Sequence, residues 1–497
     1  MTGHGGDLTR RSLLRASAVG SATWLLRRPG RAQAAAAPVV VDVHAHNFNA
    51  TDLPVLGFVA HFIPFLTDFS REVWDEPDKL CRKLAEEVIT AIKVVTPKAA
   101  VELPEVAAMT AWPGPVADSA AADRAADAVA RGAAWLERLF GANWDINTVV
   151  RRAAQVVNLT AHRRAEVTAT MAATYPGVSL FVPMLVDYDG WVGDNASDKA
   201  PSPLADQIKV HGAFGRLSTK VPLGKQPDRE GARLHPFVAF DPRRADALAL
   251  VKRAIETEGF IGVKVYPPVG FAPTNNRCLQ PNMADAKDVD AALDALYDYC
   301  TQNDVPVTTH CSTGNEFSLG LRDLVAPHRW APVLAKFPKL RLNLGHFGHM
   351  EGIDSKRGLR SCEAWLRQAG ALMEQYQNVY ADLSGSDLNK DGAAATYAGF
   401  LRQAFAKYKS IPKRMMYGSD WWLNRFFDGA PDYLTKFQTS FMNLFPDDND
   451  MYADVLGRNA LRFLGFSSDD GGRAKNAQRL TALYESSRAV MPSWLSA

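Results

Sequence analysis

The chain has 497 residues, of which 47% are hydrophobic and 22% charged, a composition typical of a globular protein with a large core. The formal net charge is +2, but residues 1–34 hold six arginines and one aspartate, so the remainder carries −3. This balance gives no electrostatic reason to expect nucleic-acid binding. The five cysteines form no CxxC pair and are too few for a disulfide scaffold, although one or two disulfides stay an open alternative.

Residues 1–34 have the layout of a bacterial export signal. Arg10 and Arg11 form a pair in TRRSLLR, an apolar stretch follows over 16–26, and AQA at 32–34 offers a small-residue cleavage site. The arginine pair indicates a twin-arginine signal, so we expect a mature chain in the periplasm or outside the cell. The alternative is a basic disordered start with a chance arginine pair. Beyond this region, no stretch is apolar for long enough to span a bilayer.

Eight short β-rich runs follow in chain order, with helical or irregular segments between them. Most runs are apolar on both alternating faces, as expected for strands buried on two sides. Apolar positions recur at helical spacing in 243–258, 284–303 and 392–409. Eight such units predict an α/β protein, a (β/α)8 TIM barrel. The runs lie at 39–44, 179–186, 235–240, 260–266, 305–310, 340–346, 379–384 and 414–420.

Two long connections interrupt this regularity. More than a hundred residues separate the first two runs, with helical patterns at 120–140 and 146–173. We expect a helical subdomain inserted at about 50–175, near the mouth of the barrel. The second connection, rich in Gly, Pro and Asp, contains a predicted helix near 202–217. The barrel itself is expected to occupy residues 35–466, and 467–497 form a C-terminal extension that ends in a helix.

Reactive residues of a (β/α)8 barrel lie at the carboxyl ends of its strands, and polar residues occur at five of these predicted ends. In VVVDVHAH, strand alternation places His44 and His46 on one face, where two imidazoles can converge on one ion. Each residue alone has an ordinary structural explanation, but their joint placement at one rim predicts a metal site. The other polar strand ends carry Lys264, His310, His346 and Asp420.

The motifs VDVHAH, IGVKVYPP, VPVTTH, LNLGHFGH, NVYADLSG and RMMYGSDW resemble, in this order, those of the amidohydrolase superfamily. They are most similar to its amidohydrolase-related branch, which includes aminocarboxymuconate-semialdehyde decarboxylase and related aromatic-acid decarboxylases. The resemblance covers roughly residues 39–466 and ends in VLGRNALRFLGF, which is similar to the family's closing helix. The long insertion after the first strand departs from the family pattern. The resemblance implies a distorted barrel with a divalent metal at its rim.

Carried over by position, the resemblance implies that His44, His46, His310 and Asp420 bind a single metal. Imidazoles and a carboxylate suit zinc, and manganese is the alternative. His346 resembles a family histidine that acts as an acid/base group or binds a second metal. Lys264 corresponds to a lysine that is carboxylated and bridges two metals in binuclear relatives, whereas in single-metal relatives it could pair with a substrate anion. We expect one metal.

These residues predict hydrolysis of an amide, lactone or ester in a small-molecule substrate. Asp420 would accept the proton of the attacking water, with His346 and Lys264 as the other catalytic residues. Trp421, Tyr266 and Phe347 at the rim are the predicted substrate contacts, although packing beneath the insertion would explain such aromatic residues equally well. Two other functions stay open: metal-dependent non-oxidative decarboxylation of an unsaturated or aromatic acid, and non-catalytic ligand binding. A homodimer is an open alternative.

Overall fold

The structure is a computed structural model. It describes residues 38–54, 57–58, 96–116, 127, 155, 158–190, 199–225, 230–313, 319–349, 356–386, 388, 394–424, 430–446, 448–467 and 475–496. The predicted export signal and nearly all of the helical run at 120–140 lie outside the described residues.

In the described part of the chain, nine strands form two sheets in which every strand pair is parallel. One sheet has the order β1-β2-β3 and the other the order β4 to β9. Each of the eight predicted runs contains one strand, which confirms the prediction of an α/β fold with parallel strands. The two-residue strand β3 was not predicted. The strands are β1 (Val41–Ala45), β2 (Leu180–Pro183), β3 (Arg233–Leu234), β4 (Phe237–Phe240), β5 (Gly262–Val265), β6 (Val307–His310), β7 (Leu342–Gly345), β8 (Val379–Asp382) and β9 (Met415–Met416).

Single backbone contacts join the two sheets at both edges. At one joint, Met184 pairs with Phe237, and Leu185 N–H donates to the Phe237 carbonyl at 3.0 Å. At the other, Val43 N–H donates to the Tyr417 carbonyl at 3.3 Å. The eight strands other than β3 therefore follow one another around a ring, although these two joints lack the ladder of a full strand pair.

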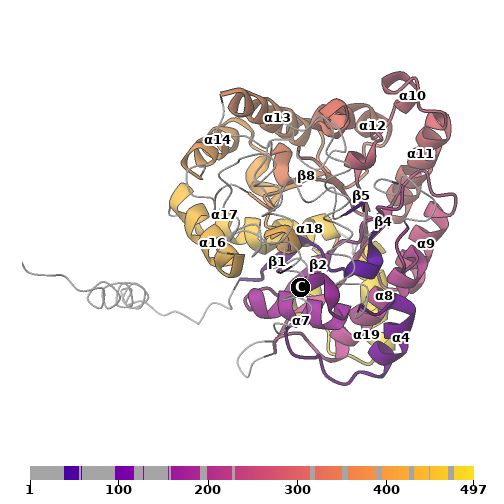
Figure 1. The fold of residues 1–497 in the computed structure, drawn as a ribbon. Coiled ribbons are helices and arrows are strands. Elements are labelled where there is room, and N and C mark those ends of the chain that lie inside the picture. The colour runs from indigo at the N-terminus through magenta and orange to yellow at the C-terminus, as the bar shows by residue number, and fades with distance from the viewer. Residues whose placement is uncertain are drawn as a thin grey trace, which may run out of the picture. The chain divides into compact units, whose positions relative to one another are not determined.

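Helices surround the strands (Figure 1). The predicted helices at 202–217, 243–258, 284–303 and 392–409 are confirmed as α8, α9, α11 and α14. α9 buries Leu250, Val251, Ala254 and Ile255 on one face, at the spacing expected of an amphipathic helix. The main helices of this layer are α8 (Leu204–Lys220), α9 (Ala247–Thr257), α11 (Ala286–Asn303), α12 (Ala331–Lys336), α13 (Lys356–Gln375), α14 (Ala394–Lys407) and α16 (Tyr433–Leu444).

The described part of the insertion contains α4 (Ala99–Ala108) and α7 (Arg164–Thr174), and α4 packs against α8. A fully buried arginine ties these segments together. The Arg164 guanidinium donates to both Asp52 carboxylate oxygens, at 2.8 and 2.5 Å, and to Glu102 Oε2 at 2.6 Å. The ion-paired side chains are at most 2% exposed. We call this group, together with Thr51 and Ser202, the Arg164 cluster.

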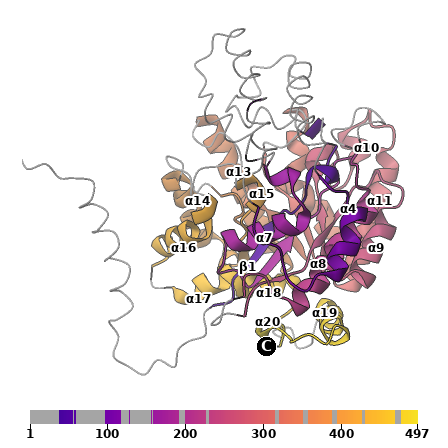
Figure 2. The same ribbon diagram turned by 60° about the horizontal axis from the view of Figure 1, so that its bottom comes forward.

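The C-terminal extension packs at the amino-terminal ends of two strands. It contains α19 (Lys475–Ser486) and α20 (Ser493–Ser496) (Figure 2). The Asn476 amide donates to the carbonyl of Ile261, the residue before β5, and Tyr484 hydrogen-bonds His235, which precedes β4. The extension therefore lies at the end of the barrel opposite to the predicted metal site.

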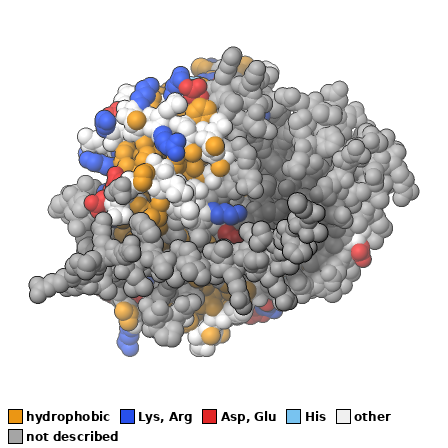
Figure 3. Space-filling view, turned by 90° about the vertical axis from the view of Figure 1, so that its left-hand side faces the viewer, with side chains coloured by type: hydrophobic (Ala, Val, Ile, Leu, Met, Phe, Trp, Pro, Cys, Tyr) orange, Lys and Arg blue, Asp and Glu red, His pale blue; other side chains and the backbone are white. Residues whose placement is uncertain are grey.

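Several sequence expectations concern the surface and the cysteines. None of the helices that the structure describes is long and apolar enough to cross a membrane. On the face that carries α14, α16 and α17 (Asn449–Ala453), the described surface mixes scattered lysines and arginines with hydrophobic and neutral side chains (Figure 3). Cys278, Cys300 and Cys311 are free thiols.

Candidate metal centre

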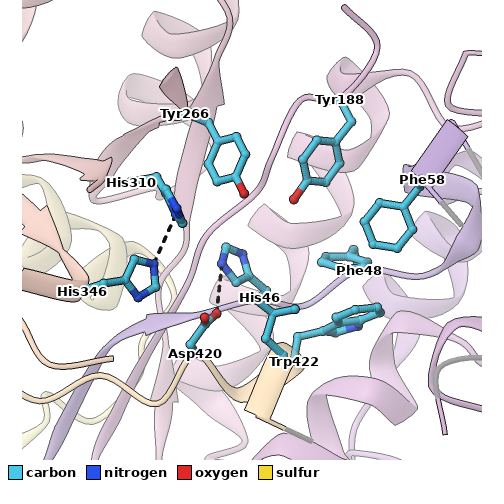
Figure 4. Close-up of a pocket in the computed structure, with 10 residues that line it drawn as sticks. His46, Phe48, Phe58, Tyr188, Tyr266, His310, His346, Asp420 and Trp422 are labelled. Atoms are coloured by element: carbon cyan, nitrogen blue, oxygen red, sulfur yellow. Dashed lines mark hydrogen bonds and ion pairs between the residues drawn. The ribbon is translucent and has the colours of Figure 1, made fainter. Parts of the chain in front are cut away.

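Four of the predicted rim residues line one pocket, and His44 and Lys264 are buried beside it. His44 lies in β1 and His46 directly after it, His310 ends β6, and His346 and Asp420 follow β7 and β9. The pocket volume is about 20 Å³, enough for about one water molecule. With the open mouth included, the volume is about 360 Å³. The pocket is lined by His46, Phe48, Phe58, Tyr188, Tyr266, His310, His346, Asp420, Trp422 and Leu423 (Figure 4).

His46 and Asp420 face each other as two hydrogen-bond acceptors. His46 Nδ1 lies 3.0 Å from the Met184 carbonyl, which can only accept, so Nδ1 carries the proton and Nε2 a lone pair. That Nε2 lies 3.5 Å from Asp420 Oδ1. Burial, with the charges of His44 and Lys264, holds the pKa of His46 well below its usual value. A neutral imidazole and a carboxylate thus direct lone pairs into the same space.

His44 is oriented by a buried carboxylate. Its Nδ1 donates to Asp382 Oδ2 at 3.0 Å, so its Nε2 also carries a lone pair. Burial alone would raise the pKa of Asp382, but its electrostatic interaction and hydrogen bond with His44 outweigh burial and hold this pKa well below its usual value. Asp382 also accepts from the Asn343 amide at 2.7 Å and the His346 backbone at 3.0 Å. A carboxylate behind a histidine fixes its tautomer and raises its basicity toward a metal.

His310 and His346 form a second, linked pair. His346 Nδ1 donates to the Ser384 carbonyl at 3.0 Å, so His346 Nε2 accepts from His310 Nδ1 at 3.2 Å. His310 Nε2 is then left as an acceptor, 2.9 Å from the Ser312 hydroxyl. Burial lowers the pKa of His346 to about 4 and that of His310 well below its usual value. Burial and the charge of Lys264 also lower the pKa of His44, so all four histidines favour the neutral form near pH 7, as metal ligands must.

The donor set fits a divalent metal. Ligand atoms of His44, His46 and Asp420 all lie within 4.8 Å of one another. The 3.5 Å between His46 Nε2 and Asp420 Oδ1 is close to the roughly 3.4 Å that separates two ligands of a tetrahedral zinc ion with bonds near 2.1 Å. His310 lines the same pocket but does not belong to this close group; it is connected to it through His346.

Lys264 lies against the first histidine. Its Nζ is 2.9 Å from His44 Nε2, and the side chain is 1% exposed. Burial lowers the pKa of Lys264 to about 8, against the opposing charges of Asp382 and Asp420. The lysine is mainly protonated at pH 7, but its neutral form is accessible. Because β5 and β1 are not neighbours, this contact also crosses the interior of the strand ring.

Two turns at the site adopt unusual backbone angles. His346, Phe347 and Asp420 have φ values of 65°, 49° and 49°, in the left-handed region that non-glycine residues rarely occupy. Such angles cost on the order of 1 kcal/mol or more each, and they persist where the surrounding structure enforces them. Here Asp420 N–H donates to the His44 carbonyl at 2.7 Å, which ties the turn after β9 to β1.

The aromatic residues near the pocket differ from those predicted. Tyr266 lines it, but Trp421 and Phe347 are fully buried and are not among the lining residues, so the structure does not bring these two to the pocket. Trp422, the next residue after Trp421, lines it instead because a short helix, α15 (Trp421–Asn424), starts directly after Asp420 and turns successive side chains in different directions.

Sequence reasoning did not assign a role to several residues at the centre. Asp382 is one; its place at the end of the run at 379–384, in the quoted motif NVYADLSG, was the available signal. Tyr188, Phe48 and Phe58 had no such signal, because they lie outside the motifs that resemble the family.

Comparison with known proteins identifies the family. Residues 225–466 match the model of a family described as amidohydrolase. This segment, just under half of the chain, therefore belongs to the amidohydrolase family. The match supports a metal-dependent enzyme that acts on a small molecule. The matched range contains Lys264, His310, His346 and Asp420, whereas His44 and His46 precede it. No curated protein matches the chain.

Solved structures with similar folds share little sequence with this chain. An amidohydrolase from Burkholderia multivorans with bound zinc is 16% identical, with 63% of this chain and 91% of that chain covered and a TM-score of 0.37. An amidohydrolase from Mycobacterium avium subsp. paratuberculosis is 14% identical, with 67% of this chain and 81% of that chain covered and a TM-score of 0.35. A uronate isomerase from Thermotoga maritima is 9% identical, with 86% and 94% covered and a TM-score of 0.38.

Proposed function

We propose that the protein is a metal-dependent hydrolase that cleaves an amide, lactone or ester. His44, His46, His310 and Asp420 would hold one divalent metal, with zinc as the first choice. The observation that carries the proposal is the pair His46 Nε2 and Asp420 Oδ1, two buried acceptors 3.5 Å apart at the base of a pocket. A divalent cation fits this arrangement, because a neutral imidazole and a carboxylate are both common ligands of such a metal.

When bound, the metal would lower the pKa of a water molecule and polarise the substrate carbonyl. The chain's own residues would supply the remaining steps. Asp420 would accept the proton of the attacking water at Oδ2, its other carboxylate oxygen, and return it to the leaving group. Asp382 holds His44 in the tautomer that leaves Nε2 available. His346, with its Nδ1 proton on the Ser384 carbonyl, would orient His310 rather than act as a cationic acid at neutral pH.

Lys264 allows two forms of the site. As a protonated amine, it would place a positive charge beside Asp420 and pair with a substrate oxygen. As a neutral amine, which its lowered pKa makes accessible, it could be carboxylated and bridge two metals. We favour the single-metal form, because the ligand atoms of His44, His46 and Asp420 already form a compact group that can hold one ion.

Metal analysis and a substrate screen test the proposal. The purified chain should contain about one equivalent of metal; two equivalents would favour the bridging role of Lys264. Lactones, esters, amides and aromatic acids should then be screened, with release of acid and of carbon dioxide measured separately. Carbon dioxide release would replace the hydrolase with a decarboxylase. Binding without turnover of any compound would indicate a non-catalytic protein. Asp288→Asn, an exposed carboxylate on α11, should leave turnover unchanged.

We also propose that the protein is exported through its twin-arginine segment. The support is the order of Arg10-Arg11, the apolar stretch and AQA in the sequence. In a bacterial host, the secreted or periplasmic form should begin near residue 35 by mass spectrometry. The double substitution Arg10→Lys and Arg11→Lys should keep the chain in the cytoplasm. A wild-type chain that stays in the cytoplasm with its N-terminus intact would refute export.

A further inference from the structure

Two tyrosines of the pocket have no part in the hydrolysis described above. Tyr188 lies beyond the end of β2 and Tyr266 directly after β5, and the hydroxyls of both point into the pocket (Figure 4). Their rings meet edge to face with centroids 5.8 Å apart, and the Tyr266 side chain hydrogen-bonds that of Tyr188. The Tyr266 ring also lies 4.9 Å from the His310 ring. This tyrosine pair therefore borders the metal ligands directly.

Salt bridges from Arg244 to the two residues that flank Tyr188 hold this tyrosine in place. Arg244 binds Asp187 through two hydrogen bonds, at 2.6 and 2.9 Å, and binds Asp189 at 2.9 Å. These aspartates flank Tyr188 and line a separate cavity that also contains Arg243 and Arg244, whereas Tyr188 lines the metal pocket. A bidentate guanidinium–carboxylate pair has a defined geometry, so Arg244 fixes the segment from the side opposite the pocket.

Besides the metal ligands, the pair has apolar aromatic neighbours. The Phe58 ring lies 5.6 Å from that of Tyr188, and Phe48 packs on Trp422 at 4.3 Å. Burial raises the pKa of Tyr188, so its hydroxyl remains protonated and able to donate. A hydroxyl that accepts from its partner becomes a stronger donor.

We propose that Tyr188 and Tyr266 act as one hydrogen-bonding unit that selects substrates with a hydroxyl or ether oxygen close to the reacting carbonyl, and that Arg244 positions Tyr188. This inference rests on the proposed hydrolase function and names the substrate class for it: short acyl compounds with an added oxygen. An alkyl group in the place of this oxygen would exclude water from the tyrosine hydroxyls without offering them a hydrogen bond. A site built to bind an oxygen therefore discriminates against analogues that lack it. The limited free room favours short acyl chains.

Isosteric inhibitor pairs test the proposal without turnover. Hydroxamic acids chelate zinc, and methoxyacetohydroxamic acid differs from butyrohydroxamic acid only by an ether oxygen in place of a methylene group. 3-Methoxypropionohydroxamic and pentanohydroxamic acids form a second pair, with the oxygen one carbon further out. Binding of all four to the zinc-loaded full chain is measured by calorimetry for wild type, Tyr188→Phe, Tyr266→Phe and the double variant. Tyr297→Phe is the control, since Tyr297 is a buried tyrosine of α11 that donates to the Pro273 carbonyl.

The preference for the ether is the Kd of the alkyl compound divided by the Kd of the ether. In at least one inhibitor pair, this ratio should be about 5- to 50-fold larger for the wild type than for either Phe variant. The double variant should lose no more than the worse single variant, because the hydroxyls act together. Tyr297→Phe should keep the wild-type preference. Equal preference in wild type and Phe variants, additive losses, or no binding of any hydroxamate would overturn the proposal.

Arg244→Lys separates positioning from general destabilisation. Lysine keeps the charge but cannot make the two parallel hydrogen bonds of the guanidinium to Asp187. The ether preference should therefore fall partway toward that of Tyr188→Phe, while affinity for the alkyl compounds stays within about twofold of the wild-type value. A parallel loss for both compounds would mean that Arg244 has only a structural role. Failure of the hydrolase proposal is distinguishable: the ether preference would persist while no ester, lactone or amide is cleaved.

Discussion

The Arg164 cluster and the candidate metal centre are both groups of buried charged side chains, but their hydrogen bonding differs in kind. In the Arg164 cluster, guanidinium donors meet acceptors: Asp52, Glu102, Thr51 and Ser202. At the metal centre, His46 Nε2 and Asp420 Oδ1 are acceptors that face each other. A saturated cluster stabilises the fold, whereas converging acceptors create a place for a cation at some expense of stability.

The largest effect is expected from Asp420→Asn. The amide cannot accept the proton of the attacking water and is a weaker metal ligand, so turnover should fall by about 10²- to 10⁴-fold. The thermal unfolding temperature of the metal-free chain should stay the same or rise, because an acceptor facing His46 is replaced by a group that can donate. Turnover is compared with Asp288→Asn, and stability is followed by calorimetry. A large loss of metal-free stability would place Asp420 with the structural residues.

Arg164→Met should show the opposite pattern. It leaves Asp52 and Glu102 buried without their cation, and breaking such a pair costs about 3–5 kcal/mol of unfolding free energy. Metal affinity of the folded fraction should remain unchanged, since no ligand is lost. Denaturant unfolding measures the effect, and Arg163→Ala is the matched control, because Arg163 is exposed and pairs with the exposed Glu105. A loss below about 1 kcal/mol would contradict the structural role of the cluster.

Asp382→Asn tests how far the metal centre depends on residues behind the ligands. Without the carboxylate, His44 loses the partner that fixes its tautomer, and zinc affinity should fall about 10- to 100-fold. Affinity is measured by competition with a chelator. Asp241→Asn is the control, since this buried carboxylate pairs with Arg243 and does not line the metal pocket. Equal affinity in wild type and Asp382→Asn would show that the tautomer is fixed by other contacts, such as Ser384.

The smallest effect concerns His211, a histidine of α8 whose charge is disfavoured by burial and by nearby Arg164. Burial lowers its pKa to about 3, and neither ring nitrogen has a hydrogen-bond partner among the described residues. The unfolded chain binds a proton near pH 6.5 but the folded chain does not, so stability is lost as the pH falls from about 6.5 toward 3. The contribution is at most about 1.4 kcal/mol per pH unit.

His211→Leu should remove this contribution, which flattens the acid side of the stability profile measured by urea unfolding between pH 4 and 7. At pH 7 the leucine variant should be as stable as the wild type or slightly more so, because a buried polar ring without partners is replaced by an apolar side chain. An unchanged slope would show that other buried histidines, such as His235, govern acid unfolding.

Much of the fold was predictable because it depends on local patterns. Short runs that are apolar on both alternating faces located the eight strands, and a period of 3.6 located α8, α9, α11 and α14. The rim residues followed from position alone, since parallel strands around one ring bring their carboxyl ends together. His44, His46, His310, His346, Lys264 and Asp420 could therefore be expected near one pocket before any contact was known.

Which side chains pair with one another was decided only by the tertiary structure. Arg164 meets Asp52 and Glu102 across more than sixty residues of chain, and Asp382 reaches His44 across the ring of strands. The choice of Trp422 over Trp421 depends on how α15 starts, and the position of the C-terminal extension depends on Tyr484 meeting His235. The sequence by itself determined the elements and the chemical types at their ends, because periodicity is a local property. Hydrogen-bond partners, tautomers and pocket walls arise from packing between distant segments, which no local pattern records.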